Sequence, residues 1–259
     1  MHNIRIIPRL DIKGPNLIKG IQFDGYRVLG TAEEFAEIYY NAGADELIYQ
    51  DAVASLYRRN SLIEIIERTA KKIFIPLTVA GGIRSIEDIR KILRAGADKV
   101  AINTAAIENP GLLSEAANIF GSQCIVSSIE AFRKDNGGYE VWVDYGREPS
   151  GVNAIEWAKK VEEMGAGEIL LTSINRDGMG NGYDLELTRT IAEAVSVPVI
   201  ASGGAGNPSH FAEVLTNGKA DAALAASLFH DGKLLIPDLK RELQMLNVQV
   251  RMHSTDKNE

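Results

Sequence analysis

Short apolar runs alternate with amphipathic stretches along most of the chain. The runs are rich in β-branched and small residues and end in polar residues or glycine; they lie at 5–11, 46–52, 75–81, 99–104, 124–130, 168–174, 197–203 and 221–227. Nearly unbroken runs of this kind are typical of strands that are buried on both faces of a parallel sheet. The pattern therefore predicts eight parallel strands.

The stretches between these runs carry recognisable helix starts. Thr31–Glu34 and Ser61–Glu64 have the spacing of a capping box, and Ser85–Asp88 is close to it. Asn207 precedes a proline, which suits the first position of a helix. Strands that alternate with helices in this way favour an α/β fold with a parallel sheet.

Eight strand–helix units in a chain of 259 residues predict one closed (β/α)8 TIM barrel. We expect the barrel over residues 1–251 and a disordered polar tail at 252–259. A doubly wound open sheet is the alternative, but no linker or break in composition divides the chain. A glycine pair within residues 134–146 predicts a small hairpin in the loop after the fifth strand.

The chain also resembles itself. PLTVAGGIRS, which starts at residue 76, is similar to PVIASGGAGN, which starts at residue 198, and in both a helix follows and then Ala-Asp before the next strand. Two half-barrels are the simplest explanation. The repeat pairs Asp11, at the end of strand one, with Glu130, at the end of strand five. Barrel active sites lie at the carboxyl ends of the strands, so these two acids are predicted to be functional.

Paired glycines add a second prediction. Gly81-Gly82 follows strand three, with Asn103-Thr104 after strand four; Gly203-Gly204 follows strand seven, with Ala226-Ser227 after strand eight. Glycine lets an anion approach the backbone, and a following helix start offers unpaired N–H groups. Tight turns alone would also explain each pair. Because the device occurs twice, we expect a long ligand with a phosphate at each end.

Composition excludes several classes of function. The net charge of −7 argues against general nucleic-acid binding. Cys124 is the one cysteine, so neither an internal disulfide nor a cysteine-based zinc site is available. The four histidines lack metal-ligand spacing, and no dinucleotide fingerprint or P-loop is present, so we expect no metal and no cofactor. No apolar run or leader suggests a membrane or secretion, and a cytoplasmic location is expected.

The motifs RIIPRLDIK, GADELIYQDA, IPLTVAGGIRS, AGADKVAIN, GAGEILLTSINRDG and PVIASGGAG resemble the cyclase subunit of imidazole glycerol phosphate synthase, and the similarity covers about residues 4–251. The resemblance implies a lyase of histidine biosynthesis that uses ammonia from a partner glutaminase. Its substrate is a bisphosphorylated ribulosyl-aminoimidazole carboxamide compound. The products are imidazole glycerol phosphate and an aminoimidazole carboxamide ribotide. The sister isomerase of the pathway matches these motifs less well.

The resemblance also implies roles for individual residues. Asp11 is the general acid and Glu130 the general base. The implied substrate and phosphate contacts are Lys19, Asp51, Gly82, Asn103, Thr104, Thr172, Asp177, Gly204, Ala226 and Ser227. At the opposite end of the barrel, Arg5, Glu46, Lys99 and Glu168 stand where strands one, two, four and six begin, and in the family these positions form a ring of salt bridges that gates ammonia. The glutaminase is expected to dock on that face.

The chain departs from the family at several positions. Glu130 stands where the family has aspartate, Arg9 where it has cysteine, Ala80 where it has glycine, Ala101 where it has serine and Asn175 where it has aspartate. Arg9 either adds positive charge or covers the outside of the barrel. These changes keep one alternative open. A diverged paralogue would act as an ammonia conduit, together with a glutaminase, for a sugar amidotransferase in surface-polysaccharide synthesis.

Overall fold

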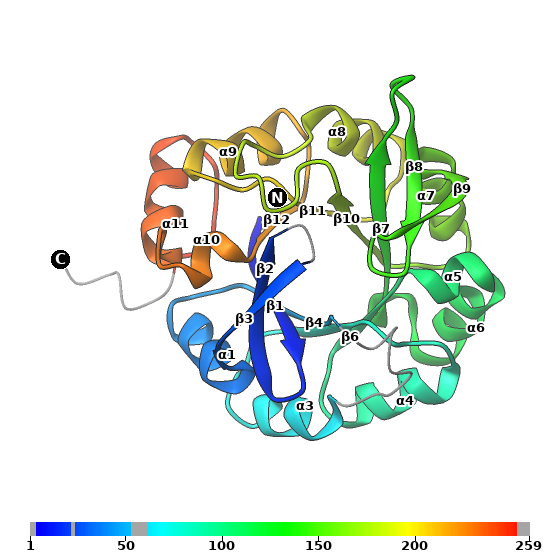
Figure 1. Ribbon diagram of the computed structural model, residues 1–259, viewed down its shortest axis with the longest axis horizontal. Coiled ribbons are helices and arrows are strands. Elements are labelled where there is room, and N and C mark those ends of the chain that lie inside the picture. Colours follow the sequence, from blue (N-terminus) through cyan, green and yellow to red (C-terminus); the bar gives the residue numbers. More distant parts are fainter. Residues whose placement is uncertain (1–3, 22–23, 53–61, 253–259) are drawn as a thin grey trace.

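The computed structural model describes residues 4–21, 24–52 and 62–252. Within these residues, eight parallel strands close into a barrel surrounded by helices (Figure 1). The barrel strands are, in chain order, β1 (Arg5–Lys13), β4 (Leu47–Asp51), β5 (Leu77–Ala80), β6 (Lys99–Ile102), β7 (Ile125–Arg133), β10 (Glu168–Ser173), β11 (Val199–Ser202) and β12 (Ala222–Ala225). Each pairs with the next, and the pairing of β12 with β1 closes the ring. The TIM-barrel prediction is confirmed.

Helices connect the strands on the outside of the barrel. They are α1 (Ala32–Asn41), α3 (Ile63–Ala70), α4 (Ile86–Arg94), α5 (Thr104–Glu108), α6 (Gly111–Phe120), α7 (Ala154–Glu163), α8 (Leu185–Ala194), α9 (Pro208–Thr216), α10 (Ser227–His230) and α11 (Ile236–Met245). Thr31 caps α1 in a complete capping box, and Ser85 and Asn207 cap α4 and α9 with their side chains. Ser61 lies outside the described residues, as does the tail beyond residue 252.

Two hairpins extend the barrel at the carboxyl ends of its strands. β2 (Asn16–Ile21) pairs antiparallel with β1 and with β3 (Asp24–Thr31), and the apolar pattern did not predict this hairpin. After the fifth barrel strand, β8 (Tyr139–Val143) pairs with β7 and with β9 (Glu148–Asn153). The prediction of a separate hairpin within residues 134–146 is therefore wrong in one respect. Its first strand is the end of β7 itself, which runs on to Arg133 because Ala131 and Arg133 pair with β8.

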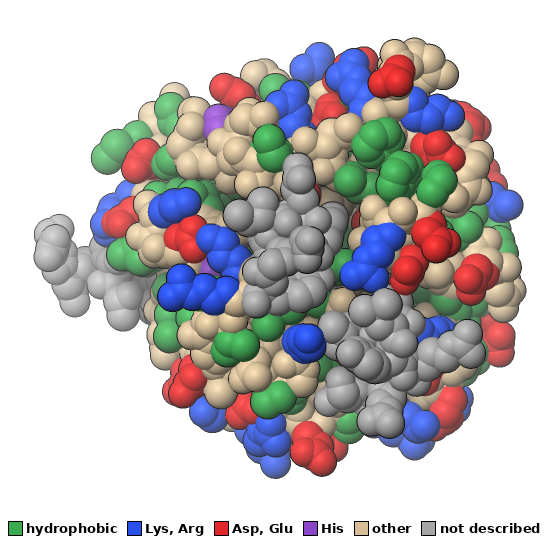
Figure 2. Space-filling model, in the orientation of Figure 1, with side chains coloured by type: hydrophobic (Ala, Val, Ile, Leu, Met, Phe, Trp, Pro, Cys, Tyr) green, Lys and Arg blue, Asp and Glu red, His purple; other side chains and the backbone are tan. Residues whose placement is uncertain are grey.

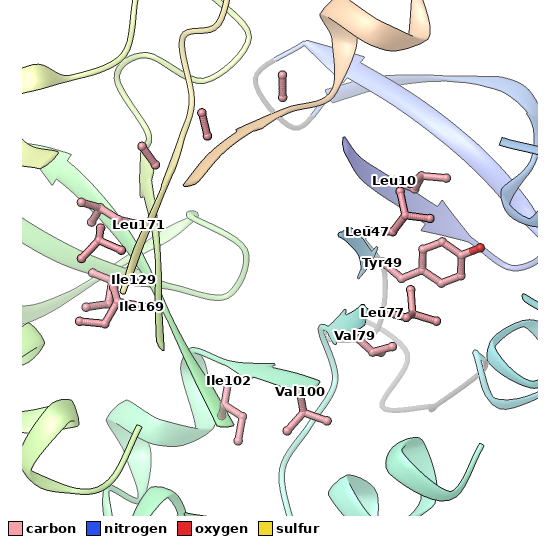
Figure 3. Close-up of a cluster of buried hydrophobic side chains, with 14 of the residues drawn as sticks. Leu10, Leu47, Tyr49, Leu77, Val79, Val100, Ile102, Ile129, Ile169 and Leu171 are labelled. Carbon is pink, nitrogen blue, oxygen red and sulfur yellow. The ribbon is translucent and has the colours of Figure 1, made fainter. Parts of the chain in front are cut away.

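Side chains alternate between the two faces of each barrel strand. Those that point outward, including Leu10, Tyr49, Val79, Ile102 and Leu171, pack in the core between barrel and helices (Figure 3). The intervening side chains point inward. The buried inward-facing cluster consists of Ile7, Ile48, Ala80, Ala101, Val126, Leu170, Ile200, Ala222 and Leu224. This apolar layer fills the middle of the barrel and separates charged side chains at its two ends.

The internal repeat is visible in the topology. The unit β5–α4–β6 corresponds to β11–α9–β12, and β1 and β7 are separated by three strands in either direction around the closed ring. Asp11 on β1 and Glu130 on β7 therefore lie on opposite sides of the same barrel opening.

Tyr49 links the barrel to two helices. Its side chain is fully buried, and its hydroxyl lies 2.8 Å from Thr69 Oγ1 and donates to the carbonyl oxygen of Ala32 at 3.2 Å. We predict that Tyr49→Phe lowers the free energy of unfolding by about 1–3 kcal/mol, because buried partners lose a hydrogen bond. Urea unfolding measures this loss, with Tyr40→Phe as the control that should change stability little. Equal effects of the two substitutions would contradict the assigned hydrogen bonds.

Candidate active site

The barrel mouth contains two neighbouring cavities. The first has a volume of about 530 Å³ and is lined by Asp51, Gly81, Gly82, Asn103, Thr104, Glu130 and Tyr145 among others; we call it the β5–β6 cavity. The second, of about 70 Å³, is lined by residues that include Arg9, Asp11, Lys19, Asp177, Gly203, Gly204, Ala226 and Ser227, and we call it the β11–β12 cavity. Basic side chains lie on both sides of the centre of the face seen in Figure 2.

The predicted ligand contacts divide between these cavities as the repeat suggests. The contacts after strands three and four line the β5–β6 cavity, and those after strands seven and eight line the β11–β12 cavity. Thr172 lines neither cavity, although it is buried on β10 directly beside Glu130 in the strand register. One acid thus lies in each cavity, Glu130 in the first and Asp11 in the second.

The glycine pairs are also required by backbone packing. Gly81 has φ 94°, and a Cβ atom there would lie 2.6 Å from the carbonyl oxygen of Asp51. Gly204 has φ 106°, and its Cβ would lie 2.1 Å from the carbonyl oxygen of Gly182. These contacts suffice to explain glycine at both positions. Phosphate binding there therefore stays a prediction that rests on the cavities and on the symmetry of the two pairs.

Asp11 is surrounded by hydrogen-bond donors. The Nε atom of Arg9 lies 3.1 Å from Asp11 Oδ1, and Nη2 donates to Oδ2 at 3.2 Å. The hydroxyl of Tyr145 donates to Oδ1 at 3.3 Å. Arg9 and Asp11 share the inward face of β1 because they are two residues apart. This rules out the suggestion that Arg9 covers the outside of the barrel; its side chain is 10% exposed and lies in the mouth.

Glu130 has a different environment. It is 8% exposed, and its carboxylate accepts hydrogen bonds from Asn103 Nδ2 at 3.1 Å and from the backbone N–H of Gly146. Burial raises the pKa of Glu130 to about 7, and the charge of Asp177 adds to the rise, while Arg9 and the two hydrogen bonds oppose it. A carboxyl group with such a pKa exchanges protons near neutral pH.

The Arg9 guanidinium also interacts with carboxylates from other strands. Its Nη2 lies 3.9 Å from Asp177, which follows β10. Burial raises the pKa of Asp177, and the nearby charge of Arg9 limits that rise. Burial alone would lower the pKa of Arg9, but Asp11 and Asp177 raise it above its usual value. Arg9 is therefore a permanent cation among the acids of the mouth.

Lys19 lies at the rim of the β11–β12 cavity. Its Nζ donates to both carboxylate oxygens of Asp231, at 2.5 and 2.7 Å, and Lys233 lies 3.1 Å from the same carboxylate. Asp231 directly follows α10, so this ion pair ties the β2 strand to the segment after β12. Lys19 thus lines the cavity, and its ammonium group forms an ion pair with Asp231.

At the opposite end of the barrel, four charged residues form a closed ring. Arg5 pairs with Glu46 at 2.8 Å and also with Glu168, while Lys99 pairs with Glu46 at 3.0 Å and with Glu168 at 2.8 Å. Thr78 donates a further hydrogen bond to Glu46 at 2.7 Å. The glutamates are buried and each has two cationic partners, which offsets their desolvation.

Comparison with known proteins fits this geometry. The family model described as "Histidine biosynthesis protein" matches residues 5–235. The chain belongs to this family. It is similar to a protein of Methanopyrus kandleri named "Imidazole glycerol phosphate synthase subunit HisF", with 52% identity over 95% of this chain and 97% of the relative.

Several departures from the family pattern have clear positions. Ala80 and Ala101 belong to the apolar layer inside the barrel and also line the β5–β6 cavity. The side-chain Oδ1 of Asn175 accepts a hydrogen bond from the backbone N–H of Arg133 at 2.7 Å.

In the part of the chain that the structure describes, no group of three or more His, Cys, Asp or Glu residues is placed to hold a metal ion. No helix among the described residues is long and apolar enough to cross a membrane.

Sequence reasoning missed the turn between β8 and β9 as part of the site. Asp144, Tyr145 and Gly146 all have positive φ, at 50°, 59° and 71°. The N–H of Asp144 donates to Thr104 Oγ1 at 3.0 Å, and Asp144 and Tyr145 line the β5–β6 cavity. The Tyr145 hydroxyl also reaches Asp11, which lines the β11–β12 cavity. A tyrosine in the left-handed region is unusual. In the sequence, the segment Asp-Tyr-Gly directly after a strand was the signal that could have indicated this turn.

The raised pKa of Glu130 predicts a pH-dependent effect on stability. The pKa is about 7 in the folded protein and about 4.3 in an unfolded chain. Ionisation of Glu130 therefore destabilises the fold progressively as pH rises through this window, and the loss is complete above about 7. In Glu130→Gln we expect a gain in unfolding free energy, relative to wild type, that grows to about 4 kcal/mol at most between acidic and mildly alkaline pH.

Urea unfolding at several pH values measures this gain. The substitution Glu67→Gln on the exposed face of α3 is the control and should give a difference that does not vary with pH. A pH-independent difference for Glu130→Gln would contradict the buried, protonated state.

Proposed function

We propose that this chain is the cyclase subunit of imidazole glycerol phosphate synthase in histidine biosynthesis. One observation carries the proposal: two acids on opposite barrel strands lie at one mouth, each beside a glycine-lined cavity. The relative of Methanopyrus kandleri, which carries this name, supports it at 52% identity. The substrate is a bisphosphorylated ribulosyl-aminoimidazole carboxamide compound, and the products are imidazole glycerol phosphate and an aminoimidazole carboxamide ribotide.

The proposed pose places one phosphate in each cavity. Gly82, Asn103 and Thr104 receive one phosphate end, and Asp51, which lines the same cavity, contacts the substrate away from that phosphate. Gly204, Ala226 and Ser227, with Lys19, receive the other phosphate. The reacting centre then lies between Asp11 and Glu130, which handle the protons of imine formation, elimination and ring closure. Thr172 and Asp177 support the substrate from the β10 side. Backbone N–H groups and lysine are suited to phosphate oxygens.

The ammonia route follows the barrel axis in this proposal. Ammonia released by a glutaminase passes the ring of Arg5, Glu46, Lys99 and Glu168 and then the apolar layer. A neutral molecule crosses apolar surroundings at far lower cost than an ammonium ion. The layer includes the small side chains of Ala80, Ala101 and Ala222. In solution near neutral pH, ammonia is mostly present as the ammonium ion. A glutaminase docked beneath the ring would release ammonia there in its neutral form, which can cross the apolar layer.

The glutaminase is proposed to dock on the face where the strands begin. Helices run antiparallel to the strands, so the ends of α1, α3 and α11 are at this face. Large apolar side chains are exposed there: Phe74 is 80% exposed, Met245 79% and Ile38 55%. Exposed apolar side chains next to a charged ring suit a protein interface.

The conduit alternative is not retained. It rested on the substitutions at the mouth, whereas the named relative is a synthase subunit that matches nearly the whole chain. The cyclase proposal includes the cytoplasmic location expected from the sequence.

Turnover without a partner tests the proposed reaction. The purified chain with an ammonium salt at alkaline pH should convert the bisphosphorylated substrate. Asp11→Asn and Glu130→Gln should each lower kcat by about 10²–10⁴-fold, because each removes a proton-transfer group. Product formation followed by absorbance or chromatography gives the rates. A folded wild-type protein without turnover, or unchanged rates in both variants, would contradict the assignment.

Coupling to a glutaminase tests the ring. In Arg5→Met, with the methionine filling similar space, we expect ammonia-driven turnover within about twofold of wild type, since the ring lies far from the chemistry. Glutamine-driven turnover should fall relative to glutamine hydrolysis, because the ring is broken. Parallel assays with both nitrogen sources measure the ratio. Arg68→Met, on the outside of α3, is the matched control, and an equal ratio in both variants would exclude the gating role.

A further inference from the structure

One side chain reaches across the barrel mouth. Tyr145 belongs to the turn between β8 and β9, a hairpin that extends from β7 by antiparallel pairing. Its hydroxyl nevertheless donates to Asp11 Oδ1, on β1, at 3.3 Å. Since β1 and β7 lie on opposite sides of the closed ring, this contact joins the two sides of the opening.

The proposed ligand has to cross the line of this contact. In one direction around the ring, β4, β5 and β6 lie between β1 and β7; in the other direction, β12, β11 and β10 do. The β5–β6 cavity therefore lies on one side of the line from β7 to β1, and the β11–β12 cavity lies on the other. One molecule with a phosphate in each cavity passes between β1 and β7 and so meets the phenol of Tyr145.

The shape of the mouth agrees with such a partition. Tyr145 lines the β5–β6 cavity, whereas its partner Asp11 lines the β11–β12 cavity. The two cavities are separate although both are at one opening. The β11–β12 cavity, at about 70 Å³, is far smaller than the ~300–1,000 Å³ of ordinary ligand pockets. The phenol and the carboxylate of Asp11 thus form part of the wall between the cavities.

The contacts that hold the turn involve groups that the ligand is proposed to use. The N–H groups on either side of Tyr145 donate to Thr104 Oγ1, at 3.0 Å, and to Glu130, while the phenol donates to Asp11. A substrate with one phosphate at Thr104 and its reacting centre between the two acids competes with all three hydrogen bonds. Binding in this pose therefore favours release of the turn.

The backbone of the turn is also strained. Asp144 and Tyr145 have φ angles of 50° and 59°, in the left-handed region that side chains other than glycine rarely adopt. Strain of this kind persists only where surrounding contacts impose it. Loss of the three hydrogen bonds would let the turn relax, which offsets part of the cost of moving the phenol.

We propose that Tyr145 is a specificity-determining residue whose phenol bars the mouth of the ligand-free protein and is displaced by a ligand that spans both cavities. A ligand that fills a single cavity leaves the phenol in place. The inference deepens the proposed function, because it rests on the pose with one phosphate in each cavity. A spanning ligand binds the open arrangement alone, so its apparent affinity is reduced by the fraction of molecules that are open.

Two substitutions of Tyr145 test the barrier. Tyr145→Phe keeps the ring and loses the hydrogen bond to Asp11; Tyr145→Gly removes the phenol, and glycine readily adopts φ 59°. The apparent Kd of the bisphosphorylated substrate, measured by calorimetry without ammonia, should fall about two- to tenfold in Tyr145→Phe, as expected for one lost hydrogen bond. In Tyr145→Gly it should fall at least as far. Tyr40→Phe, outside both cavities, is the control and should leave it unchanged.

Inorganic phosphate is the matched probe, because it fits within one cavity. Its affinity should be the same in the wild type and in both Tyr145 variants, which also shows that their phosphate sites are intact. Weaker binding of the substrate in Tyr145→Gly would show that the phenol is a ligand contact and would overturn the barrier. Unchanged substrate binding, or an equal gain for inorganic phosphate, would also overturn it.

Straight-chain diol bisphosphates of increasing length separate this inference from the proposed function, since they carry two phosphates and none of the reacting groups. Tyr145→Gly should bind chains long enough to span the cavities more tightly than the wild type does, and shorter chains equally. This result without turnover of the substrate by the wild type would refute the cyclase and leave the barrier. Turnover by the wild type, with affinities for long chains that are equal in both proteins, would refute the barrier alone.

Discussion

The mouth of this barrel concentrates three carboxyl groups, those of Asp11, Asp177 and Glu130, around the guanidinium of Arg9. The charge of Arg9 opposes the rise in pKa that burial causes at Asp177 and Glu130. With it, Asp11 is held by direct contacts, while Glu130 remains poised to exchange a proton. The distribution of charge in the mouth therefore follows from the position of one side chain.

The same alternation along the strands organises the rest of the interior. On β1, the inward residues are Arg5, Ile7, Arg9 and Asp11, from the ring through the apolar layer to the mouth. On β10, Glu168, Leu170 and Thr172 repeat this order. Strands that are charged or polar at both ends and apolar in the centre fit the ammonia route along the barrel axis that we propose.

Much of the fold and part of the site follow from local patterns in the sequence. Each barrel strand was predicted within about three residues, because runs buried on both faces are readily recognised. Asp11 and Glu130 were found because the repeat places them at equivalent strand ends. The β2–β3 hairpin was missed, since its strands contain glycine and charged residues and lie outside the barrel. Contacts such as Tyr145 with Asp11 join positions 134 residues apart, and no local pattern encodes them.

Arg9 shows why a departure from a family pattern is difficult to interpret from sequence. Its partners come from β1 and from the loop after β10, so its role depends on the closed ring of strands. Strand periodicity alone would have placed it inward beside Asp11. The presence of a neutralising partner could be judged only with the structure.

The central claim is that one doubly phosphorylated ligand spans the two cavities across the acid pair. A crystal structure of Asp11→Asn with the bisphosphorylated substrate tests it most directly. The account predicts one phosphate at Gly82 and Thr104, the other at Gly204 and Ser227, and the ketone carbon between the side chains at positions 11 and 130. Both phosphates in a single cavity, or a ligand bound outside the barrel mouth, would contradict it.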